Sequence, residues 1–584
     1  MKKIINDPAQ LVREMGFGIE LANPQIEFLE KYKIIKKREI NRDKVCLISG
    51  GGSGHEPAHA GYVGHGMLDA AVCGDVFASP SQIQVYQAIR ETAGNKGTLL
   101  IIKNYSGDMM NFKNAAYLAE EDGLQVDYVK VDDDIAVQDS LYTVGRRGVA
   151  GTVLVHKIAG ACAQRGGDLA AVKAAAEKAI CNVRSIGFSL SSCTVPAKGT
   201  PTFEIADGEM EYGAGIHGEP GIRREAMCSA QELAQRTIQA LLADFGPDAQ
   251  PTEVALLING AGSTPLQELY VLNHSVVGVL ARQGITVSRC FVGNYMTSID
   301  TFGASVTLLR LDEELKSLLD DPCDAPAFPV LHPQDAAAYR EVAPAAADDD
   351  APLCGDPAWA MLDEQRITLG NVTKMVACMM ESVIRNEVPF CEIDSHAGDG
   401  DFGMSIAKGF RQLRAEWRDI LAKPDRTIGS FLQDCALVIM EHCGGASGPI
   451  WGSAFRAAGK DAGDKTVLTV PEFAHMMQAA LVGIQKTGER SFGRGAVVGD
   501  KTLVDALAPC VDAWHGCAVA GKSTREALLA GADAAVAGAK ATESIVARMG
   551  RAGTVGERSL GYPDAGAYGL GVIFQDVAHA MCMK

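Results

Sequence analysis

The hydrophobic pattern changes once along the 584 residues, and this change divides the chain into two kinds of structure. Before about residue 333, short apolar runs of strand length alternate with segments of helical periodicity. After about residue 357 the strand pattern nearly vanishes, and apolar residues recur at helical spacing. We therefore expect an α/β domain followed by an all-α domain, because each kind of element buries its apolar face on others.

The first part of the chain predicts an α/β domain with two lobes, of which the second is not a repeat of the first. Parallel strands that alternate with helices bind ligands at the carboxyl ends of the strands. Predicted strands span 44–49, 70–73, 98–102, 185–191, 253–258, 286–292 and 305–311, and predicted helices span 81–92, 108–121 and 229–243.

The stretch from 332 to 352 is rich in Ala, Asp and Pro, and no apolar face is available to bury at its far end. It therefore predicts a linker. We place the two domains at 1–333 and 357–584, with the linker at 334–356. Consecutive helices with short connections indicate an all-α bundle in the second domain. They are predicted at 369–386, 405–422, 428–442, 471–488, 502–518 and 523–550.

The composition of the chain argues against several classes of function and partner. A net charge of −18 leaves no Lys/Arg stripe to neutralise phosphates, which argues against nucleic acid as a partner. No apolar run reaches membrane-spanning length, and the basic N-terminus lacks the apolar core of a signal peptide. The 16 cysteines form no Cys-x-x-Cys pair, so neither a zinc site nor a disulfide framework is indicated. These features favour a cytoplasmic protein with free thiols and no membrane partner.

The segment Glu211-Tyr-Gly-Ala-Gly-Ile-His217-Gly-Glu-Pro-Gly221 places one histidine in a run of glycines. Glycine lets a ligand approach the backbone closely. A neutral imidazole there can accept a hydrogen bond, bind a metal or attack a carbonyl carbon. A tight turn after a strand, in which His217 is only hydrogen-bonded, explains the same pattern.

Two further loops directly follow predicted strands. Gly50-Gly-Gly-Ser-Gly-His55 offers N–H groups to an anion or to hydroxyl groups, and His55 is of a type that titrates near neutral pH. Lys103-Asn-Tyr-Ser-Gly-Asp108 places a carboxylate where it can act as a general base or hold a hydroxyl group. A structural turn for the first loop and a helix N-cap for Asp108 are the alternatives.

The second domain contains the acidic loop Asp394-Ser-His-Ala-Gly-Asp399-Gly-Asp401-Phe-Gly403. Three carboxylates within eight positions repel one another, and Mg²⁺ relieves this repulsion because it prefers oxygen ligands and commonly brings phosphates. A helix cap followed by a turn is the alternative. Later loops at 444–448, 499–502 and 550–551 offer N–H groups or positive charge to a nucleotide.

One motif match is rejected. The residues Gly516-Cys-Ala-Val-Ala-Gly521-Lys522-Ser523 fit the P-loop expression. A P-loop needs a buried strand before it and a helix after it. Because 504–514 is predicted to be helical, we interpret this segment as a connection between two helices.

Taken together, these residues resemble the dihydroxyacetone kinases of the single-chain, ATP-dependent type, over almost the whole chain. Residues 1 to about 333 are similar to the sugar-binding K domain, through Gly50-Gly-Gly-Ser-Gly-His-Glu-Pro, Cys73-Gly-Asp-Val-Phe, Asn104-Tyr-Ser-Gly-Asp-Met-Met-Asn-Phe and Gly215-Ile-His-Gly-Glu-Pro-Gly. Residues from about 357 are similar to the nucleotide-binding L domain, through Gly398-Asp-Gly-Asp-Phe-Gly, Gly444-Gly-Ala-Ser-Gly-Pro and Gly499-Asp-Lys-Thr-Leu.

The resemblance implies a role for each matching residue of the K domain. His217 would form a covalent hemiaminal with the keto carbon of the substrate. His55 and Asp108 would bind and activate the hydroxyl group that is phosphorylated. The same sugar pocket would include Gly52, Ser53, Gly54 and Lys103.

In the L domain, the resemblance implies that Asp394, Asp399 and Asp401 hold Mg²⁺ against ATP. Nucleotide contacts would come from Phe402, Gly403, Met404, Ser405, Ser447, Gly448, Leu503, Arg551, Asp564, Ala565 and Gly566. The resemblance also implies an antiparallel barrel of eight helices and a homodimer.

Two motifs depart from the family pattern near the nucleotide. Asp564-Ala-Gly-Ala567 replaces Asp-Pro-Gly-Ala, and Gly550-Arg-Ala-Gly-Thr554 replaces Gly-Arg-Ala-Ser-Tyr. The resemblance predicts ATP-dependent phosphorylation of dihydroxyacetone, with glyceraldehyde and erythrulose as further candidate substrates, in glycerol and carbohydrate metabolism. The alternatives are a cyclising FAD-AMP lyase, which needs no His217, a non-catalytic ketose sensor, a carbohydrate-binding protein, and a kinase whose nucleotide is rephosphorylated by a phosphotransferase system.

Overall fold

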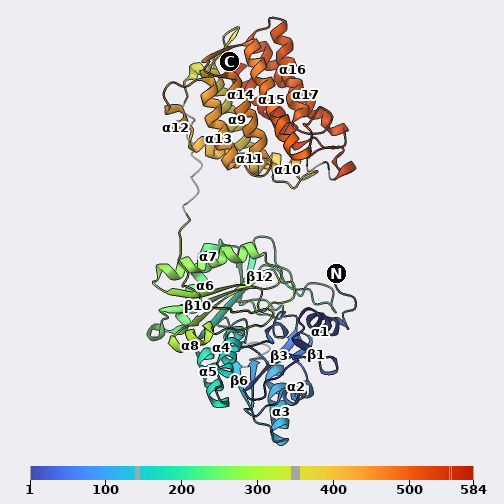
Figure 1. The fold of residues 1–584 in the computed structure, drawn as a ribbon, viewed down its shortest axis with the longest axis vertical. Coiled ribbons are helices and arrows are strands. Elements are labelled where there is room, and N and C mark those ends of the chain that lie inside the picture. The colour runs from blue at the N-terminus through green and yellow to red at the C-terminus, as the bar shows by residue number, and fades with distance from the viewer. Residues whose placement is uncertain (1, 138–144, 343–354, 551–552, 554, 583–584) are drawn as a thin grey trace. The chain divides into compact units, whose positions relative to one another are not determined.

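The computed structural model describes residues 2–137, 145–342, 355–550, 553 and 555–582. They form two compact units, Met1–Val342 and Ala343–Lys584 (Figure 1). The first unit contains two mixed sheets with helices, and the second is almost entirely helical. The prediction of an α/β domain followed by an all-α domain is therefore confirmed.

The first sheet has six strands in the order β1-β2-β4-β3-β5-β6. β3 (Cys46–Ser53) lies inside the sheet and pairs in parallel with β4 (Ala70–Val76) and β5 (Thr98–Lys103). The other strands are β6 (Val126–Val131), parallel to β5, and the antiparallel strands β1 (Ile26–Leu29) and β2 (Ile34–Lys37). The predicted loops at 50–55 and 103–108 lie at the carboxyl ends of β3 and β5.

The second sheet has the order β11-β10-β12-β7-β8-β9 and only one parallel pair, β10 with β11. Its strands are β7 (Val183–Ser189), β8 (Glu209–Tyr212), β9 (Arg223–Ala226), β10 (Glu253–Gly260), β11 (Thr286–Gly293) and β12 (Gly303–Arg310). The short strands β8 and β9 escape prediction because each has only four residues. They precede and follow the loop that carries His217.

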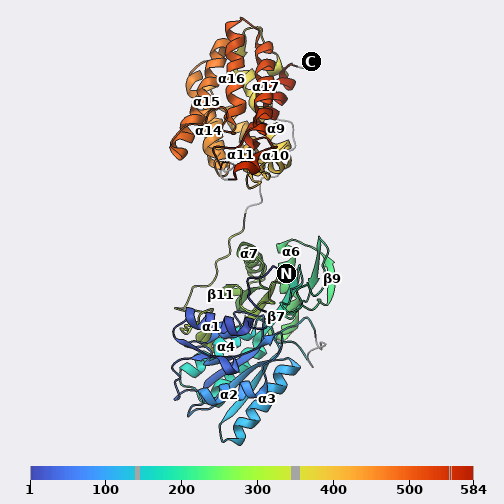
Figure 2. The same cartoon turned by 90° about the vertical axis from the view of Figure 1, so that its right-hand side faces the viewer.

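Helices and sheets alternate in five layers through the first unit (Figures 1 and 2). Successive residues of a strand point to opposite faces, so Ile48 packs with α2 and α3 while Leu47 packs with α4 and α5. In the second sheet, Leu257 packs in the same core as α4 and α5, and Ile258 packs in the core with α6 and α7. The helices are α2 (Gln82–Thr92), α3 (Ser106–Glu121), α4 (Thr152–Gln164), α5 (Leu169–Asn182), α6 (Ala230–Phe245) and α7 (Leu266–Arg282), with α1 (Leu11–Ala22) and α8 (Glu313–Asp320) at the margins of the middle layer.

The start of the predicted linker packs along α7. The ring of Tyr339 lies against Gly278, where a Cβ atom would stand 2.8 Å from the ring. His274 Nε2 donates to the carbonyl of Arg340 at 2.9 Å, and the N–H of Ala337 donates to Val287 at 2.8 Å. These contacts attach 337–340 to the first unit, and 343–354 lie outside the described residues.

Eight helices of 14 or more residues form a closed ring in the described part of the second unit, each in contact with the next and α18 with α9. They are α9 (Leu369–Arg385), α11 (Phe402–Ala415), α13 (Ile428–His442), α14 (Ser447–Ala462), α15 (Val470–Phe492), α16 (Val504–Val519), α17 (Thr524–Ala541) and α18 (Ala565–Cys582). An apolar cavity of about 140 Å³ lies between them. The predicted eight-helix barrel is confirmed.

Capping residues explain where several of these helices begin. Thr368, Thr427, Thr469 and Ser523 each accept a hydrogen bond from the backbone N–H three residues later, which satisfies a group that the helix leaves unpaired. Other boundaries differ from prediction. The helix expected at 405–422 is two helices, α11 and α12 (Trp417–Ala422), and the helix expected to reach 550 ends at Ala541. The ring is joined by α10 (Glu387–Asp394) and by a short ribbon of β13 (Arg366–Thr368) and β14 (Val467–Thr469).

Candidate active site

The first candidate site lies where the two sheets of the first unit meet. The end of β3 supplies His55, and β5 with the start of α3 supplies Lys103 and Asp108. The loop after β8 supplies His217, and the loop between β11 and β12 supplies Thr297. The fold therefore brings together side chains that are far apart in the sequence and that were predicted as separate motifs.

The imidazoles of His55 and His217 face each other. Their Nε2 atoms are 3.3 Å apart, and His55 Nδ1 is 2.8 Å from the carbonyl oxygen of Thr297. A carbonyl only accepts hydrogen bonds, so His55 Nδ1 carries the proton and His55 Nε2 is an acceptor in the neutral ring. His217 Nε2 therefore donates its proton to His55.

The surroundings of His217 keep its imidazole neutral. Its ring meets Tyr105 edge to face with centroids 4.6 Å apart, and Phe77 with centroids 5.3 Å apart. Burial lowers the pKa of His217 well below its usual value, and the charges near it on Lys103 and Arg147 act in the same direction. Burial also lowers the pKa of His55 to about 3. Both rings are therefore neutral at neutral pH, and each carries a proton on one nitrogen only.

A buried ion-pair cluster anchors the loop of His217. The backbone N–H of His217 donates to Glu219 Oε2 at 2.7 Å, and Glu219 Oε1 is 2.9 Å from Arg147. Arg147 also pairs with Asp134 at 2.7 Å and donates to the carbonyl of Gly213 at 2.9 Å. Because one planar guanidinium serves all these acceptors, it determines the path of the loop.

Lys103 and Asp108 form the opposite side of the site. Both side chains are almost fully buried, with Lys103 Nζ 3.7 Å from Asp108 Oδ2. Among the described residues, no group hydrogen-bonds Asp108 Oδ1. Burial raises the pKa of Asp108, which makes it a stronger base, and lowers the pKa of Lys103. Gly51 is required beneath this pair, because a Cβ there would lie 2.6 Å from Lys103 Nζ.

The three predicted pocket residues before His55 pack closely against neighbouring groups; they are Gly52, Ser53 and Gly54. A Cβ on Gly52 would lie 2.7 Å from the amide nitrogen of Ala78, and Gly54 has a φ of +104° against the ring of Phe77. The hydroxyl of Ser53 donates to the carbonyl of Gly74 at 2.7 Å. Because the Ser53 hydroxyl already donates its proton, it can only accept a hydrogen bond from a ligand. The main chain of these residues offers the other polar groups.

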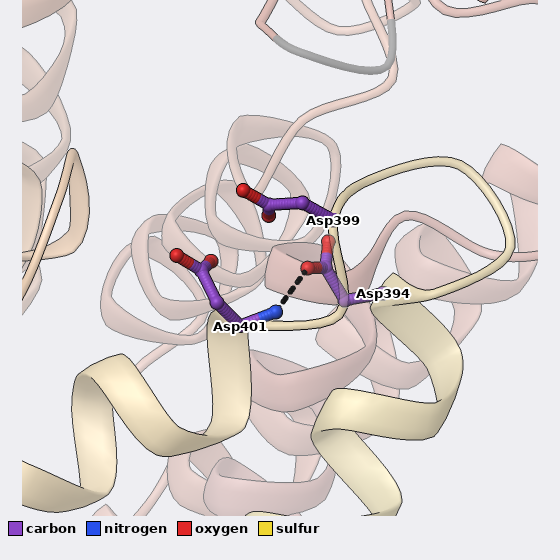
Figure 3. A group of neighbouring side chains, drawn as sticks. All are labelled: Asp394, Asp399 and Asp401. Carbon is purple, nitrogen blue, oxygen red and sulfur yellow. Dashed lines mark hydrogen bonds between the residues drawn. The ribbon is translucent and has the colours of Figure 1, made fainter. Parts of the chain in front are cut away.

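The second candidate site is a cavity of about 210 Å³ in the helical unit. It contains Asp394, Asp399 and Asp401 (Figure 3), and one carboxylate oxygen from each lies within 4.8 Å of those of the other two. Asp394 Oδ2 accepts from the N–H of Asp401 at 3.1 Å, which folds the loop back on itself. Gly398 permits this fold, because a Cβ there would lie 2.2 Å from Asp394 Oδ1. Three converging carboxylates are a donor set that suits Mg²⁺.

Four helices begin at this cavity. α11, α14, α16 and α18 present Phe402, Ser447, Leu503 and Ala565 to it at their first turns or caps. The unpaired N–H groups and the dipole of a helix N-terminus attract anions. The cavity therefore combines three carboxylates with the positive ends of four helices.

The predicted nucleotide residues divide into three groups. Those that line the cavity are Phe402, Ser405, Ser447, Leu503, Asp564, Ala565 and Gly566. Gly403 packs on α10 and Gly448 on the end of α13, where Cβ atoms would lie 2.0 Å from Glu387 and 2.8 Å from Cys443, and Met404 is exposed. Arg551 lies outside the described residues. Lys501 of the predicted loop 499–502 also lines the cavity, together with residues that were not predicted, including Trp451 and Met549.

Asp564 has a structural role at the cavity. Its Oδ2 accepts from the N–H of Ala567 at 2.8 Å and so caps α18. Burial raises the pKa of Asp564 to about 7, and the charges of Asp505 and Asp394 act in the same direction. The P-loop-like segment has no part in this cavity. It joins the end of α16 to α17, and Ser523 caps α17, as predicted.

Models of two protein families match the chain, a Dak1 domain at residues 17–327 and a DAK2 domain at 396–579. The dihydroxyacetone-binding subunit DhaK of PTS-dependent dihydroxyacetone kinase 1 from Listeria innocua is 48% identical over 56% of this chain and 100% of its own. D-erythrulose kinase of Mycolicibacterium smegmatis is 34% identical over 100% of this chain and 99% of its own. Triokinase/FMN cyclase of Homo sapiens is 32% identical over 99% of each chain.

The dihydroxyacetone kinase of C. freundii has a similar solved structure, with 30% identity, a TM-score of 0.59 and coverage of 99% of each chain. Its complex with AMP-PNP and Mg²⁺ matches with the same values. The chain therefore belongs to the single-chain dihydroxyacetone kinase family, and it is a kinase. In the described part of the chain, no helix is both long and apolar enough to cross a membrane.

Proposed function

We propose that this kinase transfers the γ-phosphoryl group of ATP to a hydroxyl group of a small ketose held covalently by His217. The observation that carries this proposal is the contact between the Nε2 atoms of two neutral histidines, His55 and His217, at 3.3 Å. An imidazolium cannot attack a carbonyl group, so the ring must be neutral, and burial keeps both rings neutral.

The capture step needs no external reagent. As His217 Nε2 gives its proton to His55 Nε2, its acceptor, the electron pair freed on His217 Nε2 forms a bond to the carbonyl carbon and the C=O π bond breaks. The proton then passes from His55 Nε2 to the carbonyl oxygen, which becomes a hydroxyl group. Covalent capture fixes a small and flexible substrate that non-covalent contacts would hold loosely. It also selects for ketones and aldehydes over glycerol, which has no carbonyl group.

Asp108 is the proposed base for the hydroxyl group that accepts the phosphoryl group. Its buried carboxylate has a raised pKa, which favours proton abstraction near neutral pH. Lys103, 3.7 Å away, keeps the carboxylate charged before substrate binds and can hold a substrate oxygen. Gly52, Ser53, Gly54 and His55 complete the proposed sugar pocket.

Mg²⁺ and ATP are proposed to occupy the helical cavity. Asp394, Asp399 and Asp401 would hold the metal, which neutralises charge on the phosphates when bound. The N-termini of α11, α14, α16 and α18 would bind phosphate oxygens. The solved relative with AMP-PNP and Mg²⁺ supports this ligand pair.

Dihydroxyacetone is the substrate that we propose first, with glyceraldehyde and erythrulose next. The names of the relatives include a dihydroxyacetone-binding subunit and a D-erythrulose kinase. We also propose that the chain acts as a homodimer. FMN cyclisation is a second candidate activity, favoured by the relative named triokinase/FMN cyclase. It would use only the metal and nucleotide cavity.

A coupled assay of ADP release tests the proposal. Mg-ATP is supplied with dihydroxyacetone, D-glyceraldehyde, D- and L-erythrulose or glycerol. Turnover with at least one carbonyl compound and none with glycerol is expected. Equal rates of ADP release with glycerol and with the carbonyl compounds would contradict carbonyl capture. Silence with every carbonyl compound, together with cleavage of FAD in the presence of Mn²⁺, would establish the cyclase instead.

A further inference from the structure

Lys501 lines the nucleotide cavity, yet its charged end is directed into the protein. It lies in the turn between α15 and α16 and is 1% exposed. Its Nζ donates to the carbonyl oxygens of Tyr562 at 2.8 Å and Ile545 at 3.2 Å, and to that of Ser559. An ammonium group has three N–H donors. All three are therefore used by main-chain oxygens.

The three carbonyl groups belong to the chain that connects α17 to α18. This connection contributes Met549, Pro563 and Asp564 to the wall of the cavity. A further attachment to the loop at 499–503 is the bond from the N–H of Arg548 to the carbonyl of Asp500 at 3.0 Å. Lys501 thus binds three carbonyl groups that are well separated along this connection and holds them together beside the cavity.

The same connection reaches the acidic loop through an aromatic contact. The ring of Tyr562 stacks on the imidazole of His396, with centroids 3.9 Å apart and planes inclined by 13°. His396 lies in the acidic loop between Asp394 and Asp399. A displacement of Tyr562 is therefore passed to the two carboxylates that flank His396.

We propose that Lys501 is a positioning residue of the nucleotide site, which holds the wall of the cavity and the acidic loop in place and makes no contact with phosphate. The predicted effect of Lys501 on ligand affinity rests on the proposed nucleotide binding. Its predicted effect on the structure of the cavity wall does not. A contact with phosphate would withdraw the ammonium from its three carbonyl partners, and the carbonyl group of Ser559, whose bond is buried, would lose this partner, which is costly. Lysines in nucleotide sites are usually phosphate ligands, so the two roles make opposite predictions.

Hydrogen exchange of the full chain without ligands tests the positioning role directly. Lys501→Met removes the ammonium and keeps a side chain of similar length, and Lys522→Met is the control, because Lys522 is exposed and pairs only with Glu526. We expect faster exchange at 555–564 and 394–401 in Lys501→Met, with α13 and α14 unchanged, and wild-type exchange in Lys522→Met. Unchanged exchange at both segments in Lys501→Met would overturn the proposal.

Binding of adenosine and of Mg-ATP then separates the two roles. If Lys501 positions the wall, Lys501→Met weakens adenosine binding about tenfold and weakens Mg-ATP binding at least as much, because the displaced acidic loop also holds the metal less well. Wild-type affinity for adenosine, with a loss for Mg-ATP alone, would show that Lys501 does not hold the wall and would overturn the inference. If wild-type protein binds neither ligand, the nucleotide proposal fails, while the exchange experiment still decides the role of Lys501.

His396→Ala provides a second variant in case Lys501→Met does not fold. His396 is exposed, and its replacement leaves the three bonds of Lys501 intact. We expect faster exchange at 394–401 and a several-fold higher Mg²⁺ concentration for half-maximal ATP binding, with an unchanged melting temperature. Wild-type exchange at 394–401 and wild-type Mg²⁺ dependence would remove the proposed link from Lys501 to the acidic loop.

Discussion

Lys103 and Asp108 are both almost fully buried, yet 3.7 Å separates Lys103 Nζ from Asp108 Oδ2. A charge-assisted hydrogen bond would be nearly an ångström shorter. The two groups therefore stabilise each other's charge while leaving hydrogen-bonding capacity, since no described group bonds to Asp108 Oδ1. This spacing suits a substrate hydroxyl group that is held and deprotonated at the same place.

Asp108→Asn tests that role. The amide is isosteric but cannot accept the proton, so kcat should fall by about 10²–10⁴-fold while the KM for the ketose changes little. Asp127→Asn is the control, because Asp127 forms a partly exposed ion pair with Lys173. Steady-state kinetics of both variants measure the effect. A kcat near the wild-type value in Asp108→Asn would show that Asp108 is only a structural partner of Lys103.

Asp399→Ala should abolish binding of Mg-ATP and leave ketose binding intact. Removal of one of three carboxylates leaves too few oxygen ligands to hold Mg²⁺ against phosphates. Isothermal titration with Mg-ATP and with dihydroxyacetone measures the two events separately. Asp464→Ala, at an exposed position of the same unit, should behave as wild type. Loss of both ligands in Asp399→Ala would indicate misfolding and not a metal site.

His217→Ala should lose discrimination against glycerol. Without the imidazole, a ketone has no covalent advantage, and only contacts shared with glycerol remain. The ratio of kcat/KM for dihydroxyacetone to that for glycerol should fall towards one, while binding of Mg-ATP is unchanged. A variant that still prefers the ketone strongly would place the selectivity in other residues.

Buried neutral histidines should make the first unit sensitive to acid. Burial lowers the pKa of His156 to about 3, as it does for His55, whereas an unfolded histidine has its usual value near 6.5. Below pH 6.5 the unfolded chain binds protons that the folded chain does not. The free energy of unfolding therefore falls as pH drops, by up to about 1.4 kcal/mol per pH unit for each such histidine.

Urea unfolding at pH 7 and pH 5 measures this loss of stability. All four tryptophans lie in the second unit, at positions 359, 417, 451 and 514, so tryptophan fluorescence follows that unit separately. Hydrogen exchange in β3 and β5 follows the first unit. His156→Met should reduce the pH dependence, because His156 contributes one of the depressed pKa values. Equal stability of the first unit at both pH values would contradict neutral buried histidines.

The sequence predicted the parts of the site that depend on local chemistry. The cluster of Asp394, Asp399 and Asp401 is visible because three carboxylates within eight positions repel one another, and a cation relieves this repulsion. His55 and Asp108 were visible because each follows an apolar strand. The ring of eight helices followed from helical periodicity together with the family resemblance.

The contacts that tune the site depend on topology and could not be predicted. Thr297 determines which nitrogen of His55 carries the proton, and the two residues are 242 positions apart. Arg147 anchors the loop of His217 from the connection between β6 and α4, and nothing in the sequence pattern around Arg147 distinguishes it from a surface residue. Which side of a helix start faces the cavity was equally hidden: Phe402 and Ser447 line it, whereas the Cβ positions of Gly403 and Gly448 face neighbouring backbone.

Carbon NMR of the wild-type chain with dihydroxyacetone labelled with ¹³C at the carbonyl carbon, in the absence of ATP, tests the central claim most directly. Addition to His217 converts the carbonyl carbon to a tetrahedral carbon bonded to nitrogen. The bound ligand should therefore show a tetrahedral-carbon signal in the wild type and in Asp399→Ala, and no such signal in His217→Ala. A bound ligand that retains its carbonyl signal in the wild type would contradict covalent capture by His217.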